Sequence, residues 1–277
     1  SSLYGTGAFF GVVNVIPKRG KDLGGGELVG GLGDRDSALG RVSYGKKLAN
    51  DVDVLVSVSG YRSDNIDRYV QPQLAGDAAL NFSISTDADG ERWHSAYASM
   101  QYQGLTLAAV TESRRKELPS GIYDTTLNDD RNFSLDEHKH VDAQYKHAFS
   151  GGAELFTRLY FDQYDYRSDF VFVDDTSVVN KDIAESNWWG AEAKWSKLLA
   201  KRHLLTLGAE YVDYTKSARL NVDVGDPGNT FVDFNEPFST WGAYVQDDWS
   251  VSDKVTLNLG VRYDRHYRGE TSTSPRA

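Results

Sequence analysis

One stretch of the sequence decides the fold that we expect: Val255-Thr256-Leu257-Asn258-Leu259-Gly260-Val261-Arg262-Tyr263-Asp264. Val255 and every second residue after it are apolar or aromatic, whereas the residues between them are polar or glycine. Because successive side chains of a β-strand point to opposite faces of its sheet, this alternation predicts a strand with one apolar and one polar face. The 3.6-residue period of a helix is nearly absent from the chain.

The same alternation recurs at about 11 places along the chain, which predicts an all-β fold. Four other apolar faces are formed by Val52, Val54, Val56 and Val58; by Val141, Ala143 and Tyr145; by Leu155, Thr157, Leu159 and Phe161; and by Trp189, Ala191, Ala193 and Trp195. One residue breaks the pattern, because Asp247 falls on the apolar face of its run. We expect a strand end or a β-bulge near this residue.

Short and long connections alternate between the predicted strands. Short turns are expected at Ala49-Asn50, Gln103-Gly104, Ser150-Gly151-Gly152, Leu199-Ala200-Lys201 and Ser252-Asp253. Long polar loops are expected at 64–90, 116–136, 167–185 and 219–237. Short turns on one side and long loops on the other are typical of outer-membrane β-barrels, in which the turns face the periplasm and the loops face the outside.

The spacing of roughly 50 residues between hairpins also occurs in the blades of soluble kelch propellers. That alternative fits less well, because propeller blades have four short strands, whereas strands of about 10 to 13 residues with one polar face match the span of a membrane. Aromatic residues crowd the ends of the predicted strands, where the interfacial girdles of a barrel lie. They are Trp93, Tyr97, Tyr102, Trp188, Trp189, Trp195, Trp241, Tyr244, Trp249, Tyr263 and Tyr267.

Composition narrows the possible functions. The net charge is −10 and the Lys and Arg residues form no run, so the chain lacks the basic stripe of a nucleic-acid-binding protein. The absence of Cys excludes a disulfide framework and a thiolate metal site. The mean hydropathy is −0.51, and no apolar stretch approaches the roughly 20 residues of a spanning helix, whereas barrel strands are only half apolar. The motifs of serine hydrolases, phosphate-binding loops and zinc proteases are missing, so we expect neither an enzyme nor a cofactor.

Three segments resemble the TonB-dependent outer-membrane receptors. Residues 1–18 place a small-residue turn before a Gly-Val-Val-Asn-Val-Ile strand, as at the end of the plug domain of that family, although Phe10 replaces a usual Gly and Pro17 a common Thr. Residues 52–64 look like an early strand of the family's barrel, and residues 244–264 look like a hairpin from its middle. The plug residues that carry the likeness are Leu3, Tyr4, Gly5, Gly11 and Asn14.

The resemblance implies two domains. Residues 1–20 correspond to the C-terminal end of a plug domain and residues 21–277 to the N-terminal half of an antiparallel transmembrane β-barrel. Because the family barrel has 22 strands, about 11 strands here are half of it, and we expect a signal peptide, the TonB-binding segment and most of the plug to lie upstream. Two edge strands would be left unpaired in lipid, so we expect residues 1–277 alone not to close.

The resemblance also implies a function, which is active uptake of a nutrient across the outer membrane of a Gram-negative bacterium. The expected partners are outer-membrane lipid, a small-molecule ligand and the TonB energy-transducing complex, which would act through the missing N-terminal part. A ferric siderophore is the commonest ligand of the family, and cobalamin, haem and oligosaccharides are alternatives. Two other classes stay open from the sequence: a passive porin-like channel and a soluble β-propeller binding module.

The predicted long loops carry the candidate ligand-binding residues. Aromatic side chains there can contact an aromatic or chelated ligand, or pack within their own loops; they are Tyr123, Phe133, Phe170, Phe172, Phe231 and Phe234. Carboxylates there can bind calcium, but solvated turns are the favoured alternative; they are Asp129, Asp130, Asp174, Asp175, Asp87 and Asp89.

Charged and histidine side chains are also predicted on the lumen face of the barrel. His138 and His140 share one strand face, and we expect them to be solvated barrel or loop residues rather than metal ligands. We expect a further group to hold the plug or to line the lumen: Arg158, Glu192, Lys194, Glu210 and Arg262.

Overall fold

The structure is a computed structural model that describes residues 15–64, 69–70, 84–85, 89–118, 122–126, 129–173, 177–224 and 229–277. Its main feature is one antiparallel sheet of 13 strands. These are β1 (Gly25–Leu32), β2 (Ala38–Lys47), β3 (Asp53–Ser63), β6 (Glu91–Tyr102), β7 (Leu105–Glu117), β8 (Phe133–Ala148), β9 (Ala153–Val173), β10 (Ser177–Leu199), β11 (His203–Val224), β12 (Thr230–Asn235), β13 (Phe238–Ser252), β14 (Val255–Arg265) and β15 (Thr271–Arg276). Smaller elements are α1 (Gly20–Leu23), the strands β4 (Tyr69–Val70) and β5 (Ile84–Ser85), and the 3-10 turns η1 (Ile122–Asp124) and η2 (Tyr267–Gly269).

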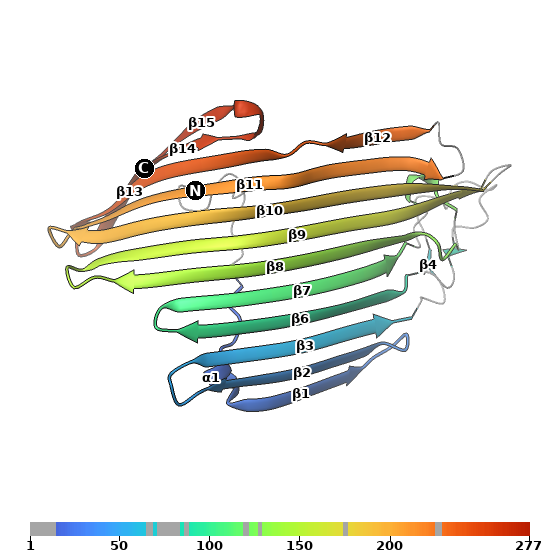
Figure 1. Ribbon diagram of the computed structural model, residues 1–277, viewed down its shortest axis with the longest axis horizontal. Helices are drawn as coiled ribbons and strands as arrows, with labels where there is room; N and C mark the ends of the chain where they lie inside the picture. Colours follow the sequence, from blue (N-terminus) through green and yellow to red (C-terminus); the bar gives the residue numbers. More distant parts are fainter. Residues whose placement is uncertain are drawn as a thin grey trace.

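The strands lie side by side in chain order, from β1 in blue to β15 in red (Figure 1). Only β12 leaves this path, because it pairs with β11 alone, and β4 pairs with β5 apart from the main sheet. The sheet is open, with β1 and β15 at its edges. The structure thus confirms an all-β antiparallel fold with an unclosed sheet. Its 13 strands exceed the expected 11 or so, because β12 lies in a predicted loop and β15 follows the last predicted strand.

The alternation of the sequence becomes two faces of the sheet. Val56 on β3 pairs with Ala98 on β6, and Leu159 on β9 pairs with Ala191 on β10, so the apolar residues of neighbouring strands lie on one side. We call this side the outer face. Its large side chains are exposed, as at Leu159 with 56% of its surface exposed, which suits contact with lipid rather than water. The opposite side, the inner face, carries the polar residues.

All five short turns are confirmed, because each predicted site joins two paired strands. At the turn between β6 and β7, Gln103 and Gly104 have φ angles of 43° and 87°, which is the region of a type I′ hairpin turn. Ala200 and Lys201 repeat this geometry between β10 and β11, with φ angles of 49° and 62°. These turns define one end of the sheet, and the longer connections lie at the other end.

Two of the predicted long loops are wrong. Most of 167–185 and of 219–237 is strand, because β9 and β10 stay paired up to Val173 and Ser177, and β10 pairs with β11 up to Val224. These strands reach farther toward the loop end than their neighbours (Figure 1). The parts of these strands nearest the loop end lack a simple alternation of apolar and polar residues. Pairing with neighbouring strands, rather than the local sequence pattern, therefore determines how far they extend. We call this region the hairpin extension.

The strand end or bulge expected near Asp247 lies a few residues further along β13. Asp247 lies within β13, in register with Leu205 and Leu259, and the irregularity falls between Ser250 and Ser252. The His203 ring nitrogen Nδ1 lies 2.8 Å from Oδ2 of Asp247 on the same outer face. This contact gives Oδ2 of the carboxylate a partner near the short-turn end of the sheet, where a barrel meets the polar interface.

The segment that enters the barrel lies against the inner face. Asp53 on β3 accepts hydrogen bonds from the backbone N–H groups of Gly20 at 2.6 Å and Lys21 at 3.1 Å. Gly20 has no room for a side chain, because a Cβ there would lie 1.9 Å from the carbonyl oxygen of Val54. The predicted domain boundary after residue 20 therefore falls within α1, and the division into domains stays a prediction.

The plug residues Leu3, Tyr4, Gly5, Gly11 and Asn14 lie outside the described residues. Within the described ranges, no helix is long and apolar enough to cross a membrane.

Candidate functional site

The hairpin extension holds a cavity of about 600 Å³ at the loop end of the sheet. Four of the six aromatic residues singled out in the sequence line it, namely Tyr123, Phe170, Phe172 and Phe231. They come from η1, from the upper part of β9 and from β12, which are far apart in the sequence. Pairing of β9, β10 and β11 brings these segments together, so a site of this kind cannot be assembled from any one loop.

The rest of the cavity wall is polar. Asn180 on β10 donates hydrogen bonds of 2.9 Å to the side chains of both Asn221 and Asp223 on β11. Next to them, Arg219 binds Asp182 in a two-pronged pair, with distances of 3.2 and 2.8 Å. The cavity thus combines four aromatic rings with two carboxylates, one guanidinium and two asparagine side chains. Such a surface can stack on a ring and orient the polar groups of a ligand.

One buried asparagine holds the aromatic wall in place. Asn132, which is 2% exposed, donates to the carbonyl oxygen of Thr126 and accepts from the N–H of Val171, each at 2.7 Å. These bonds fix the segment of Tyr123 against β9, where its ring meets Phe170 edge-on at 5.6 Å. The sequence analysis missed Asn132, because its partners are distant in sequence and no local motif marks it.

Two predicted ligand residues lie elsewhere. Phe133 is 7% exposed and is covered by the guanidinium of Arg115, whose Cζ lies 3.6 Å from the ring centroid. Phe234 is 44% exposed and does not line the cavity. Phe133 therefore packs against arginine side chains of the two neighbouring strands, whereas Phe234 is a surface residue close to the site.

The predicted acidic residues do not gather into a metal site where they are described. Asp129 binds Arg131, whose guanidinium approaches its two carboxylate oxygens at 2.8 and 2.5 Å and lowers the pKa of Asp129 below its ordinary value. Asp130 is exposed, and Asp174 and Asp175 lie outside the described residues. No group of three or more His, Cys, Asp or Glu that could hold a metal ion occurs in the described part of the chain. Calcium binding by these residues stays a prediction.

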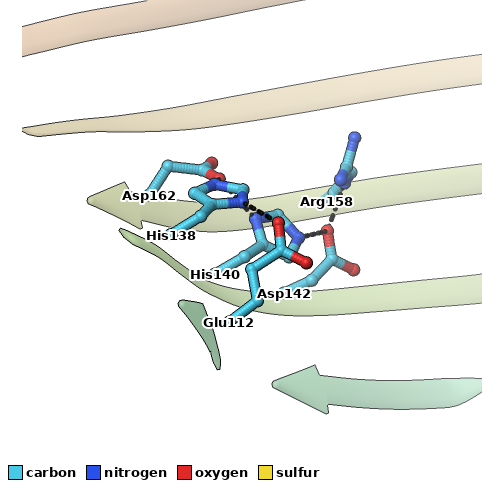
Figure 2. Close-up of polar contacts among 6 residues, drawn as sticks. All are labelled: Glu112, His138, His140, Asp142, Arg158 and Asp162. Carbon is cyan, nitrogen blue, oxygen red and sulfur yellow. Dashed lines mark hydrogen bonds and ion pairs between the residues drawn. The ribbon is translucent and has the colours of Figure 1, made fainter. Parts of the chain in front are cut away.

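A second group of polar residues lies on the inner face, and Figure 2 shows their contacts. His138 Nε2 and His140 Nδ1 both lie 2.8 Å from the same oxygen of Asp162 on β9. Around them are Glu112, at 3.7 Å from His138, and Asp142, which binds Arg158. The two histidines share one face, as predicted, but they are hydrogen-bonded to the barrel wall rather than solvated. This cluster joins β7, β8 and β9.

Two of the remaining predicted lumen residues, Glu210 and Arg262, join the later strands in the same way. Arg262 on β14 is 2% exposed and binds Asp264, with a distance of 2.7 Å, and Glu210. The ring of Tyr244 lies flat over Gly208, where a Cβ would come within 2.3 Å of the ring. Polar pairs and flat aromatic rings thus cover the inner face from β7 to β14.

These observations define a class of protein: part of an outer-membrane type of barrel, with an apolar outer face, a polar inner face and a cavity at the loop end. The family is then shown by sequence, because the model described as TonB dependent receptor-like, beta-barrel matches residues 80–277. The chain belongs to the TonB-dependent receptors. Members of this family are transport receptors of the Gram-negative outer membrane, not enzymes.

Solved structures of siderophore receptors have the same fold. The ferric enterobactin receptor of Pseudomonas aeruginosa, in complex with BCV-L6, has a TM-score of 0.66 at 16% identity, over 99% of this chain and 44% of that one. The ferric yersiniabactin uptake receptor of Yersinia pestis has a TM-score of 0.63 at 15% identity, over 91% and 42%. The ferripyoverdine receptor of Pseudomonas aeruginosa has a TM-score of 0.59 at 12% identity, over 91% and 37%.

The chain spans less than half the length of these receptors. A comparison with curated protein sequences finds no match.

Proposed function

We propose that the chain is the first half of a receptor that takes up a ferric siderophore, with the cavity of the hairpin extension as part of the ligand site. The observation that carries this proposal is the wall of Tyr123, Phe170, Phe172 and Phe231 around a polar floor. The cavity lies at the loop end, which in barrels of this type faces the outside, where a ligand arrives. The described functions of the structural neighbours support a siderophore as the ligand class.

The charge of the cavity favours one kind of siderophore. Asp182 and Asp223 together outweigh Arg219, and the guanidinium of Arg219 is already bound to Asp182. A highly anionic tris-catecholate complex would meet a net repulsive wall, because like charges in a partly enclosed site repel strongly. We therefore propose a ferric chelate of low net charge, such as a tris-hydroxamate, as the ligand.

An oligosaccharide is the second candidate. Aromatic rings stack on the apolar faces of sugars, and the side chains of Asn180, Asn221 and Asp223 can exchange their mutual hydrogen bonds for bonds to sugar hydroxyls. The two candidates differ in their need for iron. Uptake of a ligand by the receptor in the absence of iron would favour the oligosaccharide over the ferric siderophore.

The proposal extends from ligand binding to transport of the ligand through the barrel. The ligand binds at the loop end, the plug rearranges, and energy arrives through TonB by way of segments that precede this chain. The inner-face residues Asp162, Arg158 and Arg262 would line the lumen through which the ligand passes. Residues 1–20 would be the last part of the plug.

Binding and uptake by the full-length receptor test the proposal. The variant Tyr123→Ala/Phe231→Ala removes two rings that are 72% and 58% exposed, so folding should be unaffected. We expect its affinity for an iron-loaded tris-hydroxamate to fall by about tenfold or more, since each exposed ring contributes roughly 0.5 to 1.5 kcal/mol of stacking. Phe234→Ala is the matched control, because this exposed ring on β12 lies outside the cavity, and its affinity should change by less than about twofold.

Iron-limited growth and uptake of radioactive iron give the physiological measurement. A strain with the gene deleted and complemented by each variant should follow the order of the binding affinities. If the double variant and Phe234→Ala bind every ferric chelate with equal affinity, the cavity is not part of the ligand site. Tighter binding of a tris-catecholate than of a tris-hydroxamate would refute the charge argument.

A further inference from the structure

A second cavity, of about 650 Å³, lies on the inner face of the sheet between β3 and β9. We call it the inner-face cavity. Its wall includes rings and charged groups from β6 to β9, namely Trp93, Glu112, Arg114, Asp136, His138 and Tyr164. Along β9, Tyr164 lies about 20 Å from Phe170 at roughly 3.3 Å per residue, so this cavity is separate from the one in the hairpin extension.

Strand pairing brings these side chains to one side of the sheet. Trp93 is in register with Arg114, and Arg114 is in register with Asp136. One row nearer the short turns, Glu112 is in register with His138. Residues directly opposite each other on neighbouring strands share a face, so the two rows lie next to each other on the inner face, beside the histidine cluster of Figure 2.

Asp136 brings a carboxylate to the cavity without a cation that neutralises it. It accepts a hydrogen bond of 2.5 Å from the hydroxyl group of Tyr164, which is a neutral donor. Its neighbour in register, Arg114, is instead bound to Glu91 at 2.7 Å. Across the ranges that the structure describes, no ion pair within 4.0 Å involves Asp136.

Glu112 adds a second carboxylate of this kind. Its side chain is 58% exposed, and its only ion-pair contact in the described part of the chain is with Nδ1 of His138, at 3.7 Å. The other nitrogen of that ring already lies 2.8 Å from Asp162. Three carboxylates, with Glu91 as the third, thus share one guanidinium group in this cavity, and the excess negative charge attracts cations.

The aromatic wall indicates what kind of cation fits. The ring of Trp93 stacks beside Tyr61 on the neighbouring strand, with centroids 5.9 Å apart and planes at 20°. The face of a Trp ring attracts an ammonium group, and its apolar surface covers methylene groups. Glu112 is the diagonal neighbour of Asp136 across β7 and β8, and such positions are about 7–8 Å apart. Two carboxylates at this spacing can each bind one ammonium group of the same short molecule.

We propose that the inner-face cavity binds an organic cation with two or more ammonium groups, namely an alkyl diamine or polyamine. One ammonium group binds Glu112, a second binds Asp136, and the alkyl chain between them lies on the ring of Trp93. An inorganic cation fits less well, because the described part of the chain has no group of three or more acidic or histidine side chains that could hold a metal ion. An anionic chelate is repelled by the same carboxylates. This site does not depend on the ligand proposed above for the hairpin extension.

The test uses the full-length receptor in a nonionic detergent and measures binding by isothermal titration calorimetry at low salt. The probes are 1,4-diaminobutane and butane-1,4-diol, a neutral analogue with hydroxyl groups in place of the ammonium groups. We expect the wild type to bind the diamine and not the diol. Glu112→Gln/Asp136→Asn should bind the diamine at least about tenfold more weakly, because it removes both charges and keeps an oxygen for the hydroxyl group of Tyr164. Trp93→Leu should bind the diamine about threefold more weakly, because the face of the ring is lost.

The matched control is Glu137→Gln/Glu154→Gln, which removes the same charge from two exposed carboxylates of β8 and β9 outside the cavity. Its affinity for the diamine should stay within about twofold of that of the wild type. The melting temperature gives an independent readout, because the diamine should stabilise the wild type and the control but not Glu112→Gln/Asp136→Asn. Failure of the wild type to bind the diamine, equal binding of the diol, or equal binding of the diamine by the two double variants would each overturn the proposal.

Discussion

Val58 and Leu159 on the outer face expose 61% and 56% of their surface, whereas Asp162 and Arg262 on the inner face expose 5% and 2%. The apolar face of this sheet is therefore the open one and its charged face is the enclosed one, which reverses the arrangement of a water-soluble sheet. The outer face depends on lipid for its stability. The inner face depends on ion pairs and hydrogen bonds between strands that are neighbours in the sheet.

The largest effect should follow from breaking an inner-face charge network. Arg262→Ala leaves Glu210 and Asp264 without their shared cation in an enclosed site. We expect the free energy of unfolding of the full-length receptor to fall by about 3–5 kcal/mol, the usual cost of removing one partner of a buried pair. Guanidinium unfolding in phospholipid vesicles measures this loss. Arg265→Ala, on the exposed outer face of the same strand, is the control and should cost less than about 1 kcal/mol; equal losses would contradict the difference between the faces.

A charge placed on the outer face should have the next largest effect. Leu159→Arg puts a cation in the middle of the apolar surface of β9. We expect a loss of about 2–4 kcal/mol in vesicles, as for other barrels near the bilayer midplane. Phe149→Arg, beside the short turn between β8 and β9, should cost at most about 1 kcal/mol, because it lies near the interface. A similar cost at both depths would mean that the outer face does not cross the hydrocarbon core.

The two faces were not equally predictable from the sequence. Apolar residues of the outer face repeat every second position within one strand, so Val255 to Tyr263 already define it without any knowledge of neighbours. The inner-face contacts join residues far apart in the chain, such as His138 and Asp162 or Glu210 and Arg262. Their pairing depends on register, which the sequence pattern alone does not contain.

The ligand cavity was predictable in its residue types and not in its architecture. Four of the aromatic residues in supposed loops do line one cavity, but the segment around Phe170 and Phe172 is strand rather than loop. Residues 169–173 show no alternation, because both faces of the hairpin extension make contacts, as the fully buried Val171 shows. Asn132, which fixes the position of Tyr123, has no local signature at all.

Glycine-to-alanine substitutions should change the free energy of unfolding in opposite directions on the two faces. Gly208→Ala on the inner face forces the ring of Tyr244 from its place, since the new Cβ would lie 2.3 Å from it. We expect a loss of about 1–3 kcal/mol, typical of overpacking. Gly40→Ala on the outer face of β2 meets nothing within 4 Å, and should instead stabilise by about 0.5–1 kcal/mol, because alanine loses less backbone entropy. A loss at both positions would show that the outer face is as tightly packed as the inner one.

The smallest effect belongs to a charge pair outside both faces, between Asp129 and Arg131 in the connection that precedes β8. The hydrogen bonds from Arg131 lower the pKa of Asp129 relative to the unfolded chain. Folding therefore gains stability from this carboxylate above its unfolded pKa, and loses that gain as the pH falls through the lower folded pKa. We expect hydrogen exchange at Asn132 to be less than about fivefold faster in Asp129→Asn at neutral pH, because the pair is solvated. The difference between wild type and variant should vanish in strong acid, where Asp129 is protonated. A difference that persists there would mean that Asp129 orders this connection through its shape and not through its charge, unlike the enclosed pairs of the inner face.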